Sequence, residues 1–292
     1  MNPLLAELLA RGPVLTDGAW GTQLQARGLG VGDFPDLWNL THPERVAEVA
    51  QAYVDAGSQV ILTNTFGANR IRLIEAGAGD RVVEINRAGA EISRRAAGTK
   101  AKVFASIGPT GKMLMTGEVS EADLLAAFTE QAAALAAGGA DGLVVETMAD
   151  LTEAQIAVRA AKTTGLPVVG CMVFDSGKNK DRTMMGTTPE QAAAGLAEAG
   201  VDVVGANCGQ GIAGFLPICA RFRAATKLPI WVKGNAGLPQ MVDGKVHYAT
   251  TPEEFAAFIP LLIEQGASFL GGCCGTSPSF IRAVCASLGR PV

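Results

Sequence analysis

The sequence predicts an α/β protein built as a single (β/α)8 TIM barrel over residues 1–292, with its site at the C-terminal ends of the strands. Eight short apolar runs alternate with longer alanine-rich stretches of helical composition, the order expected of a parallel barrel. The runs are almost continuously apolar, as is typical of parallel strands. They lie at residues 14–16, 60–63, 103–106, 142–145, 168–171, 203–206, 230–233 and 268–271. A doubly wound open sheet is the alternative.

Three of the expected helices begin with a capping signal. Thr41, Thr188 and Thr251 each precede a proline closely, and Glu or Gln follows three residues after each threonine, as in a capping box. Glycines end four helical stretches, and we expect them in the left-handed conformation that closes a helix. These glycines stand at positions 57, 139, 200 and 266.

The composition indicates a globular protein and excludes several functions. Hydrophobic residues make up 48% of the chain, charged residues 18%, and the formal net charge is -4, which leaves no basic surface for nucleic acid. No apolar stretch reaches the roughly 20 residues that span a bilayer. The first residues lack the basic segment of a signal peptide. We therefore expect a cytoplasmic protein that binds neither nucleic acid nor a membrane.

Three of the six cysteines predict a metal site. Cys273 and Cys274 are adjacent, lie between glycines and follow the last apolar run, and Cys208 follows the sixth run in a similar setting. In a barrel these two strand ends share one rim, where three thiolates can hold zinc and leave one tetrahedral position free. A vicinal redox pair is the alternative for Cys273 and Cys274. The remaining cysteines, which we expect to pack as small apolar residues, are Cys171, Cys219 and Cys285.

Polar residues follow most of the other expected strands. Because the carboxyl ends of barrel strands carry the functional site, a ligand site explains so many buried polar groups better than separate helix caps do. These residues are Asp17, Asn64, Glu146, Asn207 and Asn235. Three long connections, at residues 21–40, 174–187 and 236–250, are expected on the same rim.

Five motifs occur in one order along nearly the whole chain. They are DGAxGT at 17–22, TNTF at 63–66, ETM at 146–148, GANCG at 205–209 and GGCCGT at 271–276. Together they resemble the zinc-dependent homocysteine S-methyltransferase family. MMGTTPE at 184–190 and NAGLP at 235–239 are most similar to the homocysteine-binding domain of cobalamin-dependent methionine synthase. The folate and corrinoid domains of that enzyme have no counterpart in this sequence, so we expect an excised module or a free-standing subunit.

The resemblance implies a role for each matching residue. It makes Cys208, Cys273 and Cys274 the ligands of Zn2+, and Asn235 a fourth ligand when substrate is absent. It implies that Asp17 and Glu146 hold the ammonium group of homocysteine. Weaker candidates shape the homocysteine pocket or bind its carboxylate through backbone N–H groups; these are Asn64, Asn207, Gly18 and Thr22.

The implied reaction is methyl transfer to homocysteine to give methionine. Zinc deprotonates the bound thiol, and the thiolate attacks the methyl donor in line. Two kinds of donor remain open: methylcobalamin on a partner protein, or a small onium compound such as S-methylmethionine or betaine. Trp38 and Trp20 are candidate contacts for an onium donor, or they only pack. The alternative functions are a corrinoid-linked demethylase subunit and a non-catalytic zinc- or thiol-binding module.

Overall fold

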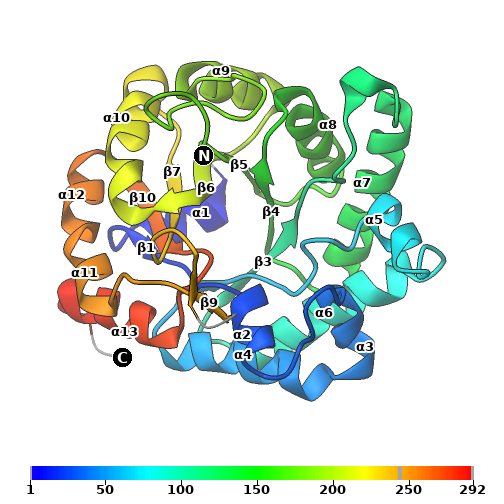
Figure 1. Cartoon of the computed structure of the whole chain (residues 1–292), viewed down its shortest axis with the longest axis horizontal. Coiled ribbons are helices and arrows are strands. Elements are labelled where there is room, and N and C mark those ends of the chain that lie inside the picture. Colours follow the sequence, from blue (N-terminus) through cyan, green and yellow to red (C-terminus); the bar gives the residue numbers. More distant parts are fainter. Residues whose placement is uncertain (1, 243–244, 291–292) are drawn as a thin grey trace.

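The computed structural model describes residues 2–242 and 245–290, in which eight parallel strands form a barrel inside a ring of helices (Figure 1). The strand order is β1-β10-β7-β6-β5-β4-β3-β2. A bridge between Thr16 and Val60 joins β1 to β2 and closes the circle. The strands are β1 (Val14–Leu15), β2 (Val60–Ile61), β3 (Lys102–Ile107), β4 (Gly142–Met148), β5 (Val168–Met172), β6 (Val203–Gly211), β7 (Ile230–Asn235) and β10 (Ala267–Gly272). The predicted barrel is confirmed, and the open sheet is excluded.

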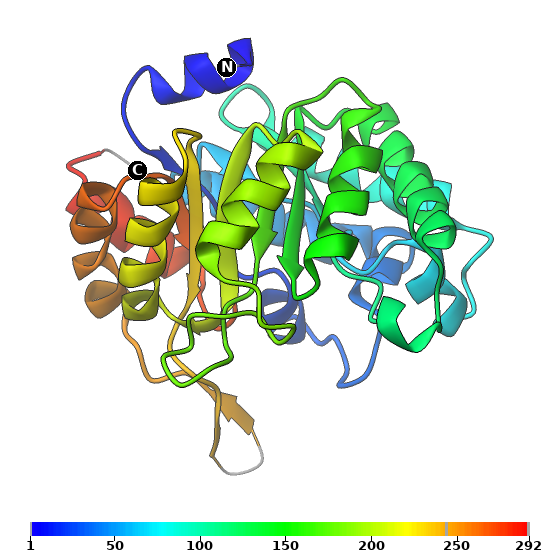
Figure 2. The ribbon, with the colours of Figure 1, turned by 90° about the horizontal axis from the view of Figure 1, so that it is seen from above.

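The barrel interior is filled by side chains from alternate strand positions. Trp231 stacks between Phe104 and Phe269, with ring centroids 6.2 and 5.3 Å away. Leu5 on α1 (Pro3–Leu9) joins this cluster, so α1 covers the amino-terminal end of the barrel (Figure 2). Cys171 is buried in the same cluster. This packing leaves the opposite end of the barrel for the site.

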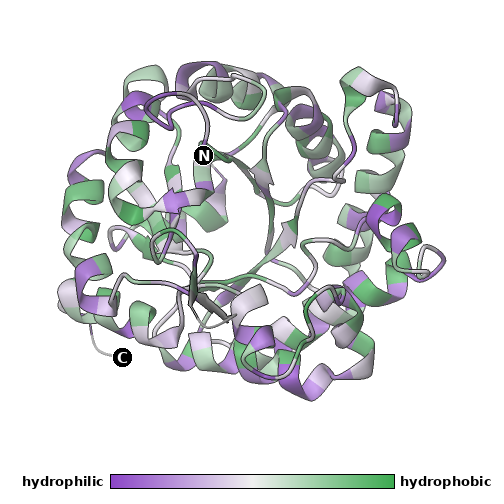
Figure 3. Cartoon of the chain, in the orientation of Figure 1, coloured by the Kyte–Doolittle hydropathy of each residue, from purple (hydrophilic) through white to green (hydrophobic). Residues whose placement is uncertain are grey.

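The outer ring alternates with the strands, and its helices pack on the barrel through apolar faces. Hydrophobic residues dominate the strands, whereas the helices carry both hydrophobic and hydrophilic residues (Figure 3). Cys219 and Cys285 are buried in this layer, as predicted. The helices are α4 (Pro43–Asp55), α6 (Val82–Ala97), α7 (Glu121–Ala137), α8 (Leu151–Lys162), α9 (Pro189–Ala199), α10 (Phe215–Ala225), α11 (Pro252–Ala257), α12 (Ile259–Glu264) and α13 (Pro278–Ser287).

Two of the three predicted helix caps are confirmed, and one is wrong. Thr188 and Thr251 form complete capping boxes at α9 and α11. Thr41 instead ends the short helix α3 (Trp38–Thr41), where its hydroxyl donates to the carbonyl of Leu37, and His42 occupies the N-cap of α4 without a side-chain bond. The Thr41 hydroxyl, which the sequence pattern predicted to cap α4, is therefore bonded within α3 instead. The four predicted C-terminal glycines all have positive φ, from 90° to 99°.

The carboxyl-terminal face carries the long connections. The first contains α2 (Gly21–Gln25), the short helix η1 (Pro35–Leu37) and α3, and the second contains α5 (Arg70–Glu75). The seventh forms a hairpin of β8 (Gln240–Val242) and β9 (Lys245–His247) that projects from this face (Figure 2); this hairpin was not among the predicted elements. Further short helices are η2 (Leu114–Thr116) and η3 (Ile212–Gly214). No helix among the described residues has the length and apolarity to cross a bilayer.

Candidate metal centre and substrate cavity

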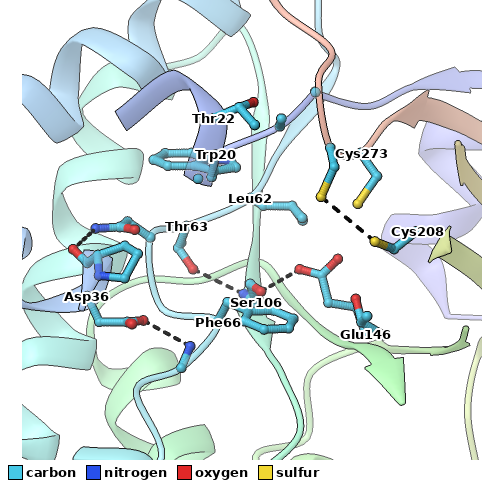
Figure 4. Close-up of a pocket in the computed structure, with 18 of the residues that line it drawn as sticks. Trp20, Thr22, Asp36, Leu62, Thr63, Phe66, Ser106, Glu146, Cys208 and Cys273 are labelled. Atoms are coloured by element: carbon cyan, nitrogen blue, oxygen red, sulfur yellow. Dashed lines mark hydrogen bonds between the residues drawn. The ribbon is translucent and has the colours of Figure 1, made fainter. Parts of the chain in front are cut away.

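The three predicted zinc cysteines converge at the carboxyl ends of β6 and β10. Their sulfur atoms lie within 4.8 Å of one another, and Cys208 Sγ is 3.8 Å from Cys274 Sγ (Figure 4). Ligands about 2.3 Å from a tetrahedral zinc ion lie about 3.8 Å apart. The sulfur geometry therefore fits zinc, with one coordination position left for another ligand.

Backbone geometry brings the cysteines together. Cys208 has a φ of 63°, a left-handed conformation that is uncommon for a residue with a side chain and marks functional sites. On β10, a Cβ atom at Gly271 would lie 2.0 Å from Thr16 Oγ1 and 2.5 Å from the Asp17 carbonyl oxygen, so this close approach to β1 requires glycine. The N–H of Cys273 donates to the Gly234 carbonyl at 2.7 Å, which fixes the cysteine loop on β7.

Without a metal, the three thiols share negative charge unequally. Hydrogen bonds from the thiols of Cys273 and Cys274 lower the pKa of Cys208 to about 3. Donation to the Cys208 sulfur raises the pKa of Cys273 well above its usual range and that of Cys274 to about 12. One thiolate held by two thiols is a site that a divalent cation would neutralise while releasing the two remaining protons.

Asn235, the predicted fourth ligand, lies at the end of β7 beside this cluster. The residue is 5% exposed, and its side chain is near enough to Cys208 to help lower the pKa of that thiol. Its Oδ1 is buried and has no hydrogen-bond partner among the described residues. Because a buried oxygen without a donor is costly, this atom is suited to a cation. Its role as a ligand remains a prediction.

A cavity of about 590 Å³ extends from the cysteines across the mouth of the barrel (Figure 4). The predicted residues that line it are Gly18, Trp20, Thr22, Asn64, Glu146, Cys208, Cys273 and Cys274. The cavity is also lined by Phe34, Asp36, Phe66, Arg72, Ser106 and Lys233, none of which was predicted as a site residue. They come from strands β3 and β7, from α5 and from the first two connections, so only the folded chain shows that they reach the site.

Glu146 is a buried carboxylate on the cavity wall. It is 7% exposed, its Oε1 accepts from Ser106 Oγ, and its Oε2 accepts from Asn207 Nδ2 at 3.1 Å. Burial raises its pKa above the usual range, and the nearby Lys233 ammonium opposes that effect. Glu146 therefore offers a buried acceptor for an ammonium group on the cavity wall.

Asn207 supports Glu146 from beneath the cavity. It is fully buried and absent from the cavity lining. Its Oδ1 accepts from the Thr147 N–H at 2.8 Å, and its Nδ2 donates to Thr147 Oγ1 at 2.7 Å. Thr147 has a φ of 60°, so these bonds hold an uncommon turn directly after Glu146. This placement indicates a positioning residue rather than a direct substrate contact.

Asp17 is fully engaged within the protein. It is 0% exposed and absent from the cavity lining. Its Oδ2 accepts from the Leu62 N–H and from Trp20 Nε1, each at 2.7 Å, while its Oδ1 accepts from Lys233 Nζ at 2.5 Å. The Lys233 side chain is 2% exposed. Burial disfavours its charge, but the carboxylates of Asp17 and Glu146 outweigh this and raise its pKa.

The remaining predicted contacts separate into two groups. Asn64 lines the cavity, but its Nδ2 donates to the Pro35 carbonyl at 2.7 Å, so it also ties the first loop in place. Trp38 lies outside the cavity lining, is 7% exposed, and packs against Arg45 and His42. This environment gives no support to a donor contact by Trp38. Of the two tryptophans, Trp20 is the one on the cavity wall.

Comparison with known proteins agrees with this geometry. Residues 14–288 match the sequence profile of a family described as homocysteine S-methyltransferase. Over 98% of its length the chain is 32% identical to methionine synthases of Mycobacterium leprae and Mycobacterium tuberculosis, of which it spans about a quarter, 25% in each case. The crystal structure of metallated homocysteine methyltransferase MmuM from Escherichia coli superposes with a TM-score of 0.81 at 25% identity, covering 98% of this chain and 99% of MmuM.

Proposed function

Because the chain belongs to the homocysteine S-methyltransferase family, we propose that it transfers a methyl group to the thiol of L-homocysteine and forms methionine. The observation that carries the proposal is the convergence of Cys208, Cys273 and Cys274 on the wall of the cavity. Two features, a left-handed φ at Cys208 and a glycine that β1 requires on β10, hold this arrangement.

The three cysteines would hold zinc as thiolates, and Asn235 Oδ1 would complete the coordination without substrate. When bound, zinc would lower the pKa of an incoming thiol and so make that thiol a nucleophile near neutral pH. The burial of Glu146 limits competition from water. Its carboxylate is therefore a strong acceptor for the substrate ammonium, and Asn207 and Ser106 hold it in position.

The methyl donor is best supported as a group on a partner protein, namely methylcobalamin. Most of the exposed large apolar side chains among the described residues lie in βα connections around the mouth: Val31, Phe66, Met113, Met115, Met184, Met185, Leu238 and Met241. Such a surface suits a protein contact, and methionines adapt to the shape of a partner. A small onium donor is the second candidate, since Trp20 presents an aromatic surface on the cavity wall.

The deciding experiment supplies zinc-loaded protein with L-homocysteine and one methyl donor at a time. The donors are methylcobalamin, S-methylmethionine and glycine betaine, and methionine is measured by mass spectrometry. We expect methionine with methylcobalamin. Methionine only with an onium compound would favour the second donor class, and no methionine with any donor would overturn the proposed function.

Two further functions are distinguished when the same assay is repeated with cob(I)alamin as the methyl acceptor. A corrinoid-linked demethylase would consume a methylated thioether and methylate cob(I)alamin more readily than the reverse. A non-catalytic module would bind zinc and homocysteine without forming methionine. Cys208→Ala, which removes one sulfur of the cluster, should lose activity. Its matched control is Cys219→Ala, because Cys219 is a buried cysteine between α10 and α12, and the activity of this control should equal that of the wild type.

A further inference from the structure

We propose that Tyr248 is a positioning residue of the metal centre, whose aromatic ring holds the cysteine loop (residues 273–275) from outside the cavity and so strengthens metal binding. The proposal rests on the proposed function, because the metal that it concerns is the zinc of the same site. Its basis is the contact between the Tyr248 ring and Gly275, together with the bonds that tie the seventh connection to the cysteine loop.

The ring of Tyr248 lies directly against Gly275, the residue that follows the two adjacent cysteines. A Cβ atom at Gly275 would lie 2.2 Å from Cγ of Tyr248 and 2.5 Å from each of its Cδ atoms. These distances are far shorter than van der Waals contact, so the ring occupies the space that a side chain at position 275 would need. Gly275 also has a φ of 79°, in the left-handed region that favours glycine. This glycine therefore lets an aromatic face rest on the backbone next to Cys274.

The seventh connection is anchored at both of its ends beside the metal centre. The N–H of Ala236 donates to the Cys274 carbonyl at 2.9 Å, and the N–H of Thr250 donates to the Ala236 carbonyl at 3.2 Å. A Cβ atom at Gly237 would lie 2.9 Å from Thr250 Oγ1, so the two ends of the connection pass close together. Tyr248 lies two residues before Thr250. This anchoring holds its ring over the cysteine loop.

Tyr248 approaches the cysteines from outside the substrate cavity. It is partly buried and packs against the hydrophobic core, yet it is absent from the cavity lining, which includes all three cysteines. Burial, and after it the charge of Cys274, Cys208 and Cys273, raises the pKa of Tyr248 to about 12, so its hydroxyl lies within electrostatic reach of the cluster. The ring thus covers the metal centre without occupying the space where the substrate enters.

Such a cover stabilises a bound metal through the ligand loop. Because cysteine binds a metal only as a thiolate, access of water and protons to the sulfur atoms favours loss of the metal. The apolar residues around a metal site limit this access, and residues that orient its ligands contribute to affinity. With the ring in place, the cysteine loop cannot move outward at Gly275 without displacing Tyr248. Removal of the ring should therefore free the loop on that side.

The test measures the zinc affinity of the full chain by competition with a chromogenic chelator. We expect Tyr248→Ala to weaken zinc binding by roughly 10- to 100-fold, the range for loss of a residue that supports a metal ligand. Tyr248→Phe keeps the ring atoms that contact Gly275 and should stay within about threefold of the wild type. Unchanged affinity in Tyr248→Ala, or an equal loss in Tyr248→Phe, would overturn the role of the ring.

Cobalt supplies a second readout that a general loss of stability would not change. In the cobalt-loaded protein, the thiolate-to-cobalt absorption bands report how the sulfur atoms surround the metal. Tyr248→Ala should alter these bands, because the loop that carries two of the three sulfurs is no longer held, and Tyr248→Phe should preserve them. Bands in Tyr248→Ala that match those of the wild type would contradict a positioning role.

Two further variants keep the result interpretable. Phe258→Ala is the matched control, because Phe258 is also a partly buried aromatic residue packed against the hydrophobic core, but at the start of α12. It should unfold at lower urea concentration, with the zinc affinity and cobalt bands of the wild type. Where Tyr248→Ala folds poorly, Tyr248→Leu keeps apolar bulk without a flat ring. It should bind zinc more weakly than Tyr248→Phe, and equal affinity of these two variants would also overturn the proposal.

The outcomes separate this inference from the function on which it rests. If the wild type binds zinc no more tightly than Cys208→Ala does, the metal centre and the proposed function both fail. If it holds zinc but forms no methionine, the proposed function fails, and the role of Tyr248 is decided by metal affinity alone. If it holds zinc and forms methionine, but Tyr248→Ala matches it in zinc affinity and cobalt bands, only the role of Tyr248 fails.

Discussion

Single residues set the chemistry of this site through their backbone as much as through their side chains. Cys208 reaches Cys274 across 66 positions of sequence because it turns off β6 with a left-handed φ of 63°. Such a conformation is retained only where the surrounding structure enforces it. Here the cluster of sulfur atoms depends on that turn.

Removal of one sulfur should abolish tight zinc binding. We expect Cys208→Ala to lower zinc affinity by more than 100-fold, since even residues that only support a metal ligand contribute about 10- to 100-fold. Zinc content is measured after dialysis against a weak chelator. Cys219→Ala should keep about one equivalent; equal zinc retention in both variants would contradict the assignment of the metal centre.

The buried carboxyl of Asp36 should make stability depend on pH. Desolvation raises its pKa from 3.8 to about 6, so the folded state binds a proton more tightly than the unfolded state does. Its contribution to stability is therefore greatest below about pH 4 and declines as pH rises through about 6. Asp36→Asn keeps an oxygen for the Gly67 N–H and should be more stable than the wild type at pH 8, by at most about 3 kcal/mol.

Urea unfolding from pH 5 to 8 measures the effect of Asp36→Asn. The advantage of the variant should shrink toward pH 5. Asp33→Asn, in the same loop but exposed, serves as the control and should show little change of this kind. A variant at position 36 that is no more stable than the wild type at pH 8 would refute the account.

At the scale of the elements, helix starts depend on more than the local motif. Thr188 caps α9 fully, whereas Thr41, with the same apparent motif, completes the last turn of α3. The difference arises because α3 precedes α4 directly, and its Leu37 carbonyl accepts the Thr41 hydroxyl.

These two threonines make a matched pair for stability measurements. Thr188→Ala should lower the free energy of unfolding by about 1 kcal/mol, the usual contribution of an N-cap. Thr41→Ala should change it by less than about 0.5 kcal/mol, as for an exposed surface position. Chemical denaturation of both variants gives the comparison, and similar losses at the two positions would show that Thr41 also acts as a cap.

At the scale of the whole molecule, closure of the barrel is weakest between β1 and β2. The two strands share the bridge between Thr16 and Val60, and side chains reinforce the seam. Gln59 Oε1 accepts from the Leu15 N–H at 3.0 Å and from Arg290 Nη1 at 2.7 Å. The carboxyl-terminal segment therefore helps to close the first strand onto the second.

Hydrogen exchange can test this seam. Gln59→Ala removes the acceptor of both the Leu15 N–H and Arg290. It should speed amide exchange in residues 14–16 and 60–62 by at least about fivefold, the effect of losing the Leu15 bond alone, and leave β5 and β6 unchanged. Gln155→Ala, which removes a bond from α8 to the Gly195 carbonyl, should not affect the seam. Uniform acceleration around the barrel would indicate that closure is not locally limited.

The sequence alone predicted the eight strands, the glycines that end helices and the three cysteines of the metal centre. Apolar runs and motifs are local patterns, so they can be recognised before the fold is known. The sequence did not identify Lys233 as a residue of the cavity. Its partner, Asp17, is distant along the chain, and the two side chains meet only in the folded barrel. Nor did the sequence reveal that Trp38 packs outside the cavity or that Asp17 is saturated by three donors. Tertiary structure decided those points, because burial and hydrogen bonding depend on residues that are distant along the chain.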